Sequence, residues 1–174
     1  MNKPPPNREQ AIETLKRNGC QPEVIAHCQA VAALALELAE KLKAKNILVD
    51  MALIEAGAFL HDLGRSKTHS VDHAFEGVKL AQAESLPEAV VCIIKRHVGA
   101  GITDEEAEQL GWPEDSYIPW SLEEKIVCYA DKCIGGSERI PVEATIQKLR
   151  DQKLCGAAER VRKLHIEITD LLEA

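Results

Sequence analysis

The sequence predicts an all-α protein, a single compact helical bundle, and three observations carry that prediction. Of the 174 residues, 45% are hydrophobic but only 3% are aromatic, so the core must be built from Leu, Ile, Val and Ala. That composition favours helices over a β-sandwich or barrel, in which aromatic and β-branched residues dominate. Apolar residues recur at helical spacing, and no segment shows convincing strand alternation. The length suits one domain, expected at residues 1–174.

Three helices are expected in the first part of the chain. Gly19 ends the first, and Pro22, a favoured first-turn residue, starts the second. Asp50 can cap the third, and Gly64 stops it. The expected ranges are Arg8–Asn18, Pro22 to about Lys45, and Met51–Leu63.

Capping signals organise the rest of the chain. Thr103 and Glu106 have capping-box spacing, and Ser121 and Glu124 repeat it. The tail, Val142–Leu172, is expected to form one broken helix or two adjacent helices. The other expected helices are Asp72–Glu84, Pro87–His97, a short one after Thr103 that ends before Gly111, and Lys125–Ile134.

Charge and composition exclude several classes of function. A net charge of −7 argues against double-stranded nucleic acid as a partner, although a bound divalent metal would still let the protein take a small anionic substrate. No apolar run of membrane-spanning length and no signal-peptide core is recognised, so no membrane partner is expected. The six cysteines show no CxxC pairing, which is typical of reduced thiols, and a cytoplasmic location is expected.

Residues of metal-ligand type fall on the apolar faces of four expected helices. His27, His61, His97 and Asp131 each follow or flank apolar residues at helical spacing, and Asp62 adjoins His61 at a helix end. Taken singly, each has a simpler explanation, as a hydrogen-bonded core histidine or as a capping or ion-paired aspartate. A carboxylate that faces a core is costly unless it is paired or binds a metal. Binding of divalent metal would explain all five with a single cause.

Two details favour the metal. Lys132 and Arg139 could pair with Asp131, but neither is expected to share its helix face. Adjacent residues in mid-helix point about 100° apart, whereas at a helix end, with Gly64 free to turn the chain, His61 and Asp62 can converge. The Asp62 carboxylate could also bridge two metals about 3.5–4 Å apart.

The order His…His-Asp…Asp, with each group on its own helix, resembles the HD superfamily of metal-dependent phosphohydrolases. Phe59–Gly64 resembles the family's HD-hydrophobic-Gly segment, and Lys125–Asp131 resembles the helix that supplies its last aspartate. The resemblance covers a core of about residues 22–136, flanked by an N-terminal helix and a C-terminal helical extension without a match. It implies a first metal held by His27, His61, Asp62 and Asp131.

The resemblance extends to binuclear members of the superfamily. His73, in His73–Gly77, resembles their His-x-x-x-Gly segment, and His97 resembles their next histidine. The full set is similar to that of the di-iron HD proteins that cleave diadenosine tetraphosphate, and more distantly to the HD-GYP cyclic-dinucleotide phosphodiesterases. The Gly-Tyr-Pro segment is absent, which argues against cyclic-dinucleotide cleavage. Two divalent transition-metal ions per chain are therefore expected, Fe or Mn first, with Zn, Ni, Co or Mg as alternatives.

The expected reaction is hydrolysis of a phosphoester or phosphoanhydride of a nucleotide-type substrate by a metal-activated water, whose pKa falls steeply on coordination, towards about 7. Asp62, Arg65 and Lys67 are the candidate catalytic residues. Arg65 offers a planar fork for phosphate and Lys67 a point charge, unless both are simply surface cations. Among the other polar residues, His69 is expected to be solvated or substrate-facing and His165 to lie on the surface. Arg96 and Lys132 are weaker candidates, because helix neighbours point elsewhere.

Three alternatives stay open. The first is a mononuclear nucleoside monophosphate phosphatase, which needs only the four-residue site. The second is a non-catalytic nucleotide- or metal-binding regulator, and the third a helical scaffold with a structural metal whose coordination sphere is closed. The expected partners are a small phosphorylated, nucleotide-like substrate and, as an open alternative, a second copy of the chain in a homodimer.

Overall fold

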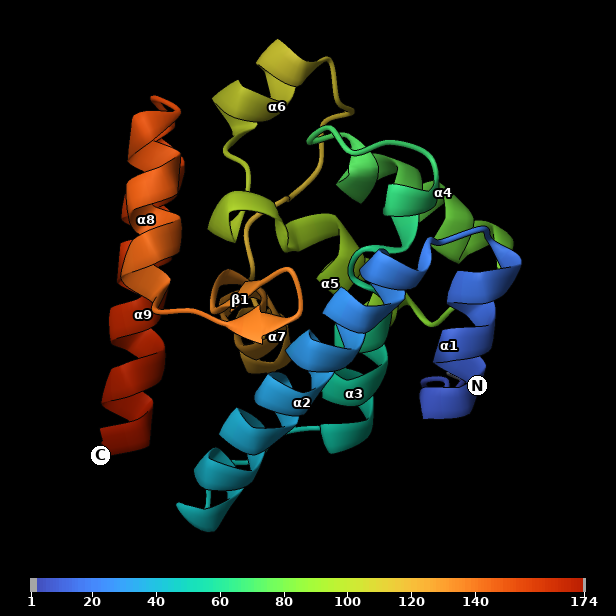
Figure 1. The fold of residues 1–174 in the computed structure, drawn as a ribbon, viewed down its shortest axis with the longest axis horizontal. Helices are drawn as coiled ribbons and strands as arrows, with labels where there is room; N and C mark the ends of the chain where they lie inside the picture. Colours follow the sequence, from blue (N-terminus) through green and yellow to red (C-terminus); the bar gives the residue numbers. More distant parts are fainter. Residues whose placement is uncertain (1–2, 174) are drawn as a thin grey trace.

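The computed structural model describes residues 3–173, and nearly all of its regular elements are helices (Figure 1). Two short 3-10 turns and one two-stranded hairpin interrupt the α-helices. The elements are α1 (Arg8–Arg17), α2 (Pro22–Ala44), α3 (Met51–Leu60), η1 (Leu63–Ser66), α4 (His73–Ala83), α5 (Glu88–Arg96), η2 (Val98–Ala100), α6 (Asp104–Leu110), α7 (Leu122–Lys132), β1 (Ile134–Gly135), β2 (Glu138–Arg139), α8 (Val142–Asp151) and α9 (Cys155–Glu173). The all-α prediction is confirmed, with the hairpin as its one correction within these residues.

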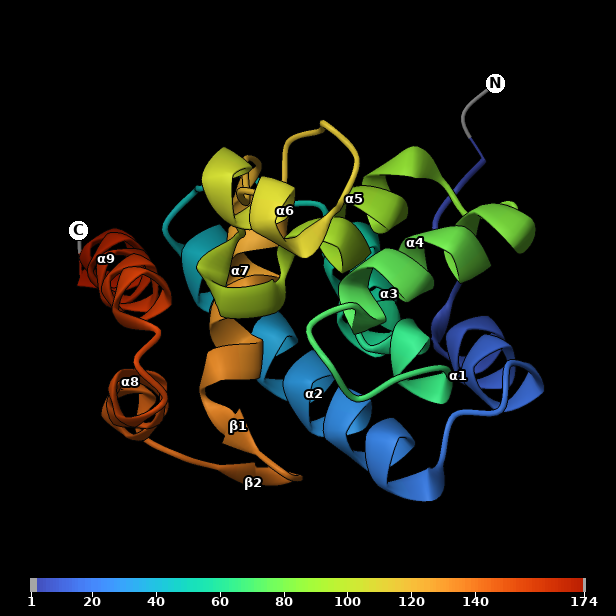
Figure 2. The same ribbon diagram turned by 90° about the horizontal axis from the view of Figure 1, so that it is seen from above.

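Helices α2 and α3 pack against each other in the centre of the bundle, and α5 and α7 pack against them. Helix α1 packs on α3 at one side, while α8 and α9 stand together at the opposite side (Figures 1 and 2). Helix α9 also contacts α7 and η2. The ends of α3, α5 and α7 and the start of α4 therefore meet in the interior.

Local signals explain where the helices begin. Asn7 accepts a hydrogen bond from the Gln10 amide, and the Gln10 side chain accepts one from the Asn7 amide, which completes a capping box for α1. Asp50 accepts from the Leu53 amide at the start of α3. The tail forms two separate helices, α8 and α9, one of the two arrangements expected for it.

Helix α2 is long and apolar enough, by length and composition alone, to cross a membrane, so the expectation that no segment reaches that length was wrong on this measure. Its apolar face lies in the core of the bundle, where Cys28, Val31, Ala35, Leu38 and Leu42 are buried at helical spacing. The helix packs there against α3 and α7. That is the pattern of a core helix.

Three of the helix boundaries in this part of the structure differ from the expected ones by two residues or more. Helix α3 ends at Leu60 rather than at Leu63, and α7 covers Leu122–Lys132 rather than Lys125–Ile134. The chain beyond α7 turns into the hairpin, in which Ile134 pairs with Arg139. Gly136 permits this tight turn because its φ is +61°, a conformation that favours glycine.

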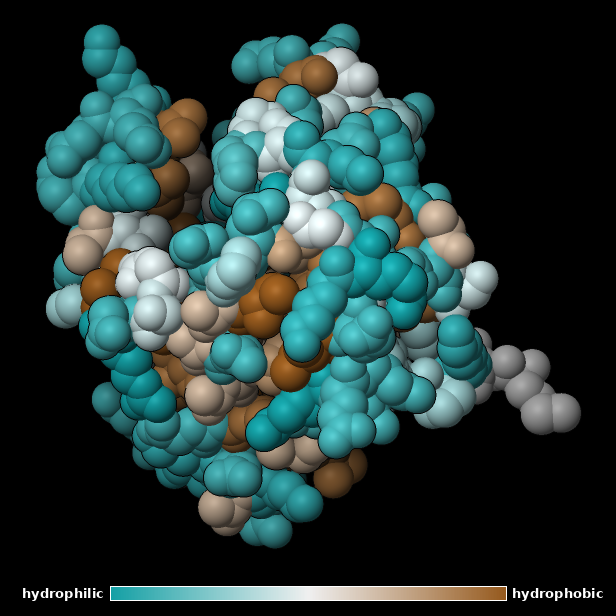
Figure 3. Space-filling view, turned by 45° about the vertical axis from the view of Figure 1, so that its right-hand side comes forward, coloured by the Kyte–Doolittle hydropathy of each residue, from teal (hydrophilic) through white to brown (hydrophobic). Residues whose placement is uncertain are grey.

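Two hydrophobic clusters hold the described residues together. The larger one fills the space among α1, α2, α3, α5, α7 and α9. The smaller one joins the segment 98–119 to the start of α4, and its buried members are Ala74, Ile102, Ala107, Trp112 and Tyr117. The face shown in Figure 3 is mostly hydrophilic, with smaller hydrophobic areas between the charged side chains.

Candidate metal centre

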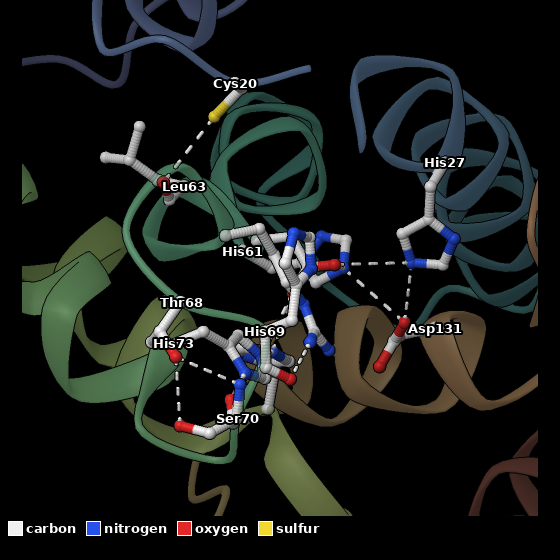
Figure 4. A network of polar contacts seen from close by, with 12 residues as sticks. Cys20, His27, His61, Leu63, Thr68, His69, Ser70, His73 and Asp131 are labelled. Carbon is white, nitrogen blue, oxygen red and sulfur yellow. Dashed lines mark hydrogen bonds and ion pairs between the residues drawn. The ribbon is translucent and has the colours of Figure 1, made fainter. Parts of the chain in front are cut away.

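The six predicted ligand residues come together in one place. His27 Nε2 lies 3.0 Å from Asp131 Oδ1, and His61 Nε2 lies 3.5 Å from the same oxygen. Figure 4 shows the His27 ring and the Asp131 carboxylate facing each other from α2 and α7. On the other side, His73 Nε2 and His97 Nε2 are 3.0 Å apart.

Asp62 lies between these two groups. Its Oδ2 atom is 3.7 Å from the Nε2 atoms of both His27 and His61. Its Oδ1 atom is 3.1 Å from His73 Nε2 and 3.4 Å from His97 Nε2. Each carboxylate oxygen thus faces a different pair of imidazoles. A carboxylate that bridges two metal ions uses its oxygens in this way.

All four imidazoles are oriented by backbone carbonyls. The Nδ1 atoms of His27, His61, His73 and His97 lie 2.6, 2.7, 2.7 and 2.7 Å from carbonyl oxygens. A carbonyl oxygen can only accept a hydrogen bond, so each Nδ1 carries the proton. In the neutral ring the Nε2 atom then carries a free lone pair, and this form of histidine binds metals. The accepting carbonyls belong to Gly136, Ala58, Ser70 and Ile94.

This arrangement fits a bound cation. His61 is fully buried, and its Nε2 atom has no hydrogen-bond partner among residues 3–173. The Nε2 atoms of His73 and His97 meet at 3.0 Å as two acceptors, between which no hydrogen bond can form when both protons are on Nδ1. Buried acceptors without donors are costly. A divalent metal is the partner that imidazole nitrogens and carboxylate oxygens share.

The surroundings also set the charges of the ligands. Burial opposes the ionisation of Asp62, but His61, His73 and His97 outweigh it and hold the pKa of its carboxyl well below the usual value. Burial likewise opposes ionisation of Asp131, and Lys132 together with the nearby histidines lowers its pKa. Burial lowers the pKa of His97 to about 4, so this ring is neutral at neutral pH.

A proton and a metal ion would compete for His27. Burial opposes its protonation, but Asp131 outweighs burial and raises the pKa of the imidazole. The group that raises this pKa is also a candidate ligand for the same ion. Binding of a metal at His27 would therefore be coupled to release of a proton.

Gly64 brings the two halves of the centre together. A Cβ atom at this position would collide with the backbone carbonyl of His73 and the amide of Gly77. Only glycine lets the start of α4 pack this closely on η1. Gly64 was expected to let the chain turn, whereas its role in the structure is this close approach. Because α3 ends at Leu60, His61 and Asp62 lie beyond its last turn and both face the centre.

The two predicted catalytic cations, Arg65 and Lys67, lie in different surroundings. The Arg65 guanidinium donates to Asp62 Oδ1 at 3.3 Å and to the carbonyl of His69 at 2.8 Å. Arg65 and the exposed His69 also line a cavity of about 560 Å³ that opens from His27, Asp62 and Asp131. Lys67 is exposed at the end of η1 and does not line this cavity.

Lys132 lies closer to the centre than the sequence predicted. It was expected to point away from Asp131, but its ammonium group lies 2.5 Å from Asp131 Oδ2 and it lines the same cavity. Both residues lie within α7, but the long, flexible Lys132 side chain reaches back to the carboxylate of its neighbour. Arg96 instead pairs with Glu124. His165 was expected on the surface, but it is half-buried, and its Nδ1 atom lies within hydrogen-bond distance of the Tyr129 hydroxyl, at 2.8 Å.

A model of the HD domain matches residues 24–135, which is more than half of the chain. The chain belongs to the HD domain family. The family predicted from the order His…His-Asp…Asp is thereby confirmed.

This HD domain is similar to proteins with different names. It is 41% identical over 167 residues to "Uncharacterized protein MJ0778" of Methanocaldococcus jannaschii, covering 95% of this chain and 98% of that protein. It is 36% identical over 166 residues to a tRNA (cytidine(56)-2'-O)-methyltransferase of Picrophilus torridus, covering 95% of this chain. The chain spans only 47% of that second relative, so the name describes a protein about twice as long as the matching part.

A solved structure shares the fold. The HD domain of the L. monocytogenes phosphodiesterase PgpH, in complex with cyclic-di-AMP, aligns with a TM-score of 0.57. The alignment covers 94% of this chain and 93% of that chain at 14% identity. At this level of identity the likeness concerns the arrangement of the helices.

Proposed function

We propose that this HD domain is a metal-dependent phosphohydrolase that cleaves a phosphoester or phosphoanhydride of a nucleotide-type substrate and uses two divalent ions. The observation that carries the proposal is the position of Asp62, whose two carboxylate oxygens each face the Nε2 atoms of a different pair of histidines. His27, His61 and Asp131 would hold one ion, His73 and His97 the other, and Asp62 would contact both. The HD family match supports this assignment, and the cyclic-di-AMP bound by the phosphodiesterase of similar fold makes a nucleotide a reasonable ligand class.

The protein's own groups have distinct tasks in this reaction. Bound divalent ions supply an acidified water and polarise the phosphoryl oxygens. The Nδ1–H groups, anchored on carbonyls, keep four Nε2 atoms aimed at the centre. The Arg65 guanidinium, fixed by Asp62 and the His69 carbonyl, lies at the cavity wall and would bind a phosphoryl oxygen of the substrate.

Hydrolysis then exchanges one bond to phosphorus for another. A water oxygen bonds to phosphorus, the bond from phosphorus to the leaving oxygen breaks, and the leaving oxygen ends with a proton. The centre lies at the base of an open cavity. That position gives a substrate access to the ligands, in contrast to a structural metal with a closed sphere of protein ligands.

The test combines metal content with turnover. Protein purified without oxygen and loaded with Fe(II) or Mn(II) is incubated with bis-p-nitrophenyl phosphate, diadenosine tetraphosphate and AMP, with matched reactions in EDTA. We expect hydrolysis of at least one of these esters or anhydrides that EDTA abolishes and Mn(II) restores. Metal-saturated protein that hydrolyses none of them would contradict the proposal and favour a non-catalytic regulator.

A further inference from the structure

The cavity at the metal centre has a wall that the HD family match does not include. The match ends at residue 135, whereas Gly136, Ile140, Ala144, Thr145 and Lys148 line the cavity together with the ligands. These residues belong to the hairpin turn, the segment that follows β2, and helix α8. In Figure 2 the hairpin lies beside α2 and the end of α7, and α8 lies further out, next to α9.

This wall is tied firmly to the centre. The Gly136 carbonyl accepts from His27 Nδ1 at 2.6 Å, and the Thr145 hydroxyl donates to the Lys132 carbonyl at 2.8 Å. The Ile140 amide donates to the Cys133 carbonyl at 2.9 Å. Helix α8 is therefore held at a fixed distance from the ligands. Lys148 follows Ala144 by four residues and Thr145 by three, so the three line the cavity from one face of α8.

The charges along the cavity are uneven. Two of its carboxylates, Asp62 and Asp131, are the proposed metal ligands and would be neutralised by bound ions. Glu23 is then the one remaining carboxylate in the lining, against the cations Arg65, Lys132 and Lys148.

These cations differ in their partners. Arg65 is already engaged with Asp62, and Lys132 with Asp131. Lys148 is exposed and has no ion pair among the residues that the structure describes. Lys148 is thus an unpaired cation on the part of the cavity wall that α8 forms. It is suited to an anion that extends beyond the reacting phosphate.

We infer that the substrate carries a second phosphate group and that Lys148 binds it while the reacting phosphate lies at the metal centre. The inference rests on the proposed function and narrows it. It favours substrates such as linear dinucleotides with a terminal phosphate over nucleoside monophosphates, which have nothing for Lys148 to bind. Lys148 would then determine specificity rather than take part in the bond-breaking step.

The matched probes are the linear dinucleotides ApA and pApA, which share the scissile linkage and differ only in the terminal phosphate. Their kcat/KM values are measured for Mn(II)-loaded protein, and the ratio of pApA to ApA is compared among variants. We expect Lys148→Gln to lower that ratio about tenfold, since one charge-assisted hydrogen bond is lost, and Lys148→Arg to restore most of it. Lys43→Gln, an exposed lysine outside the cavity, removes the same charge and should leave the ratio unchanged.

Calorimetric titration of Mn(II)-loaded protein separates binding from turnover when a methylene group replaces the leaving oxygen of the scissile linkage in both dinucleotides. Wild-type protein should bind the pApA analogue more tightly than the ApA analogue although neither can be hydrolysed, and Lys148→Gln should remove the difference. A ratio unchanged by Lys148→Gln, or lowered equally by Lys43→Gln, would overturn the inference while leaving the proposed hydrolysis intact. If calorimetry shows the Lys148-dependent difference but no phosphoester is hydrolysed, the subsite stands and the proposed function fails.

Discussion

At the scale of single residues, Asp62 has the largest expected effect on activity. Asp62→Ala removes both oxygens that face the two histidine pairs. We expect kcat to fall by at least about 10³-fold, because the metals contribute several kcal/mol of charge stabilisation in the transition state. The measurement is steady-state turnover in excess Mn(II), with circular dichroism to verify that the variant is folded.

Asp62→Asn separates the effect of the negative charge from the effect of the side chain's size. It keeps the size of the side chain but loses the negative charge, so its activity should stay close to that of the alanine variant. A folded alanine variant that retains turnover when saturated with metal would contradict the role of Asp62.

His73 and His97 test the number of ions. Wild-type protein purified without oxygen should contain about two ions per chain, and His73→Ala or His97→Ala should reduce that to about one with loss of activity. The reason is that both Nε2 atoms face Asp62 Oδ1 on the side away from Asp131. Elemental analysis gives the stoichiometry. One ion in wild type, unchanged in both variants, would favour the mononuclear nucleoside monophosphate phosphatase.

At the scale of elements, the segment that bears Trp112 holds the loop before α4. The Trp112 indole donates to Asp72 Oδ1 at 2.8 Å, and Asp72 Oδ2 accepts from the Ser70 hydroxyl at 3.1 Å. The Ser70 carbonyl in turn accepts from His73 Nδ1, a contact that lies in the network of Figure 4. A candidate metal ligand is therefore connected to a side chain 39 positions further along the chain, as the numbers 73 and 112 give.

Two substitutions separate the hydrogen bond from the packing. Trp112→Phe keeps an aromatic ring beside Phe75 and Tyr117 and should cost about 1 kcal/mol of unfolding free energy. Trp112→Ala opens a cavity in the smaller cluster and should cost about 3–5 kcal/mol. Urea denaturation measures both. Equal losses would mean that the indole N–H, rather than the ring, holds the segment.

The hairpin depends on pH through Glu37. Hydrogen bonds from Arg139 and Lys41 lower the pKa of this carboxyl to about 2. A lowered pKa in the folded state means that the ion pair stabilises the protein above about pH 4.5 and is lost as the pH falls towards 2. Glu37 and Arg139 are partly exposed, so a double-mutant cycle with Glu37→Gln and Arg139→Gln should give less than about 1 kcal/mol of coupling at pH 7. A coupling that persisted at pH 2 would contradict this assignment.

Periodicity and capping residues predicted the helices well, because both act over a few neighbouring positions. The Asp50 cap, the Thr103 capping box and the apolar face of α2 all recur in the structure. The hairpin after α7 was not predicted, since two residues per strand are too few to show alternation. Contacts between distant segments, such as Trp112 with Asp72, leave no local pattern.

The candidate ligands were easier to predict than their surroundings. A histidine or aspartate on an apolar face is visible in the sequence, whereas His73 was assigned only through the family resemblance. The chain brings all six residues together. The ion pair of Lys132 with Asp131 was missed because helical spacing fixes where a side chain starts and not how far a long, flexible one reaches back. The close approach at Gly64 depends on the packing of α4 on η1, which no single segment encodes.

At the scale of the whole molecule, metal binding should stabilise the fold. The centre draws ligands from α2, from the chain after α3, from α4, from the end of α5 and from α7, so it exists only when these elements are packed. A ligand that binds only the folded state at 100 times its Kd adds about 2.7 kcal/mol. We expect Tm to rise when Mn(II) is added to protein freed of metal and to fall again in EDTA, with Asp62→Ala showing the smaller rise. An equal rise in that variant would place the stabilising ion elsewhere.

The four carbonyl oxygens that orient the histidines are parts of the main chain. Every amino acid supplies such an oxygen, so the side chains at positions 58, 70 and 94 can change while the rings keep their tautomer, provided the backbone keeps its path. Position 136 is restricted by its left-handed backbone conformation and not by the hydrogen bond to His27. The carbonyls that surround the candidate ligands are thus placed by helix ends and turns and not by particular side chains. Sequences could diverge until little besides the ligands themselves is shared and still hold them in the same geometry.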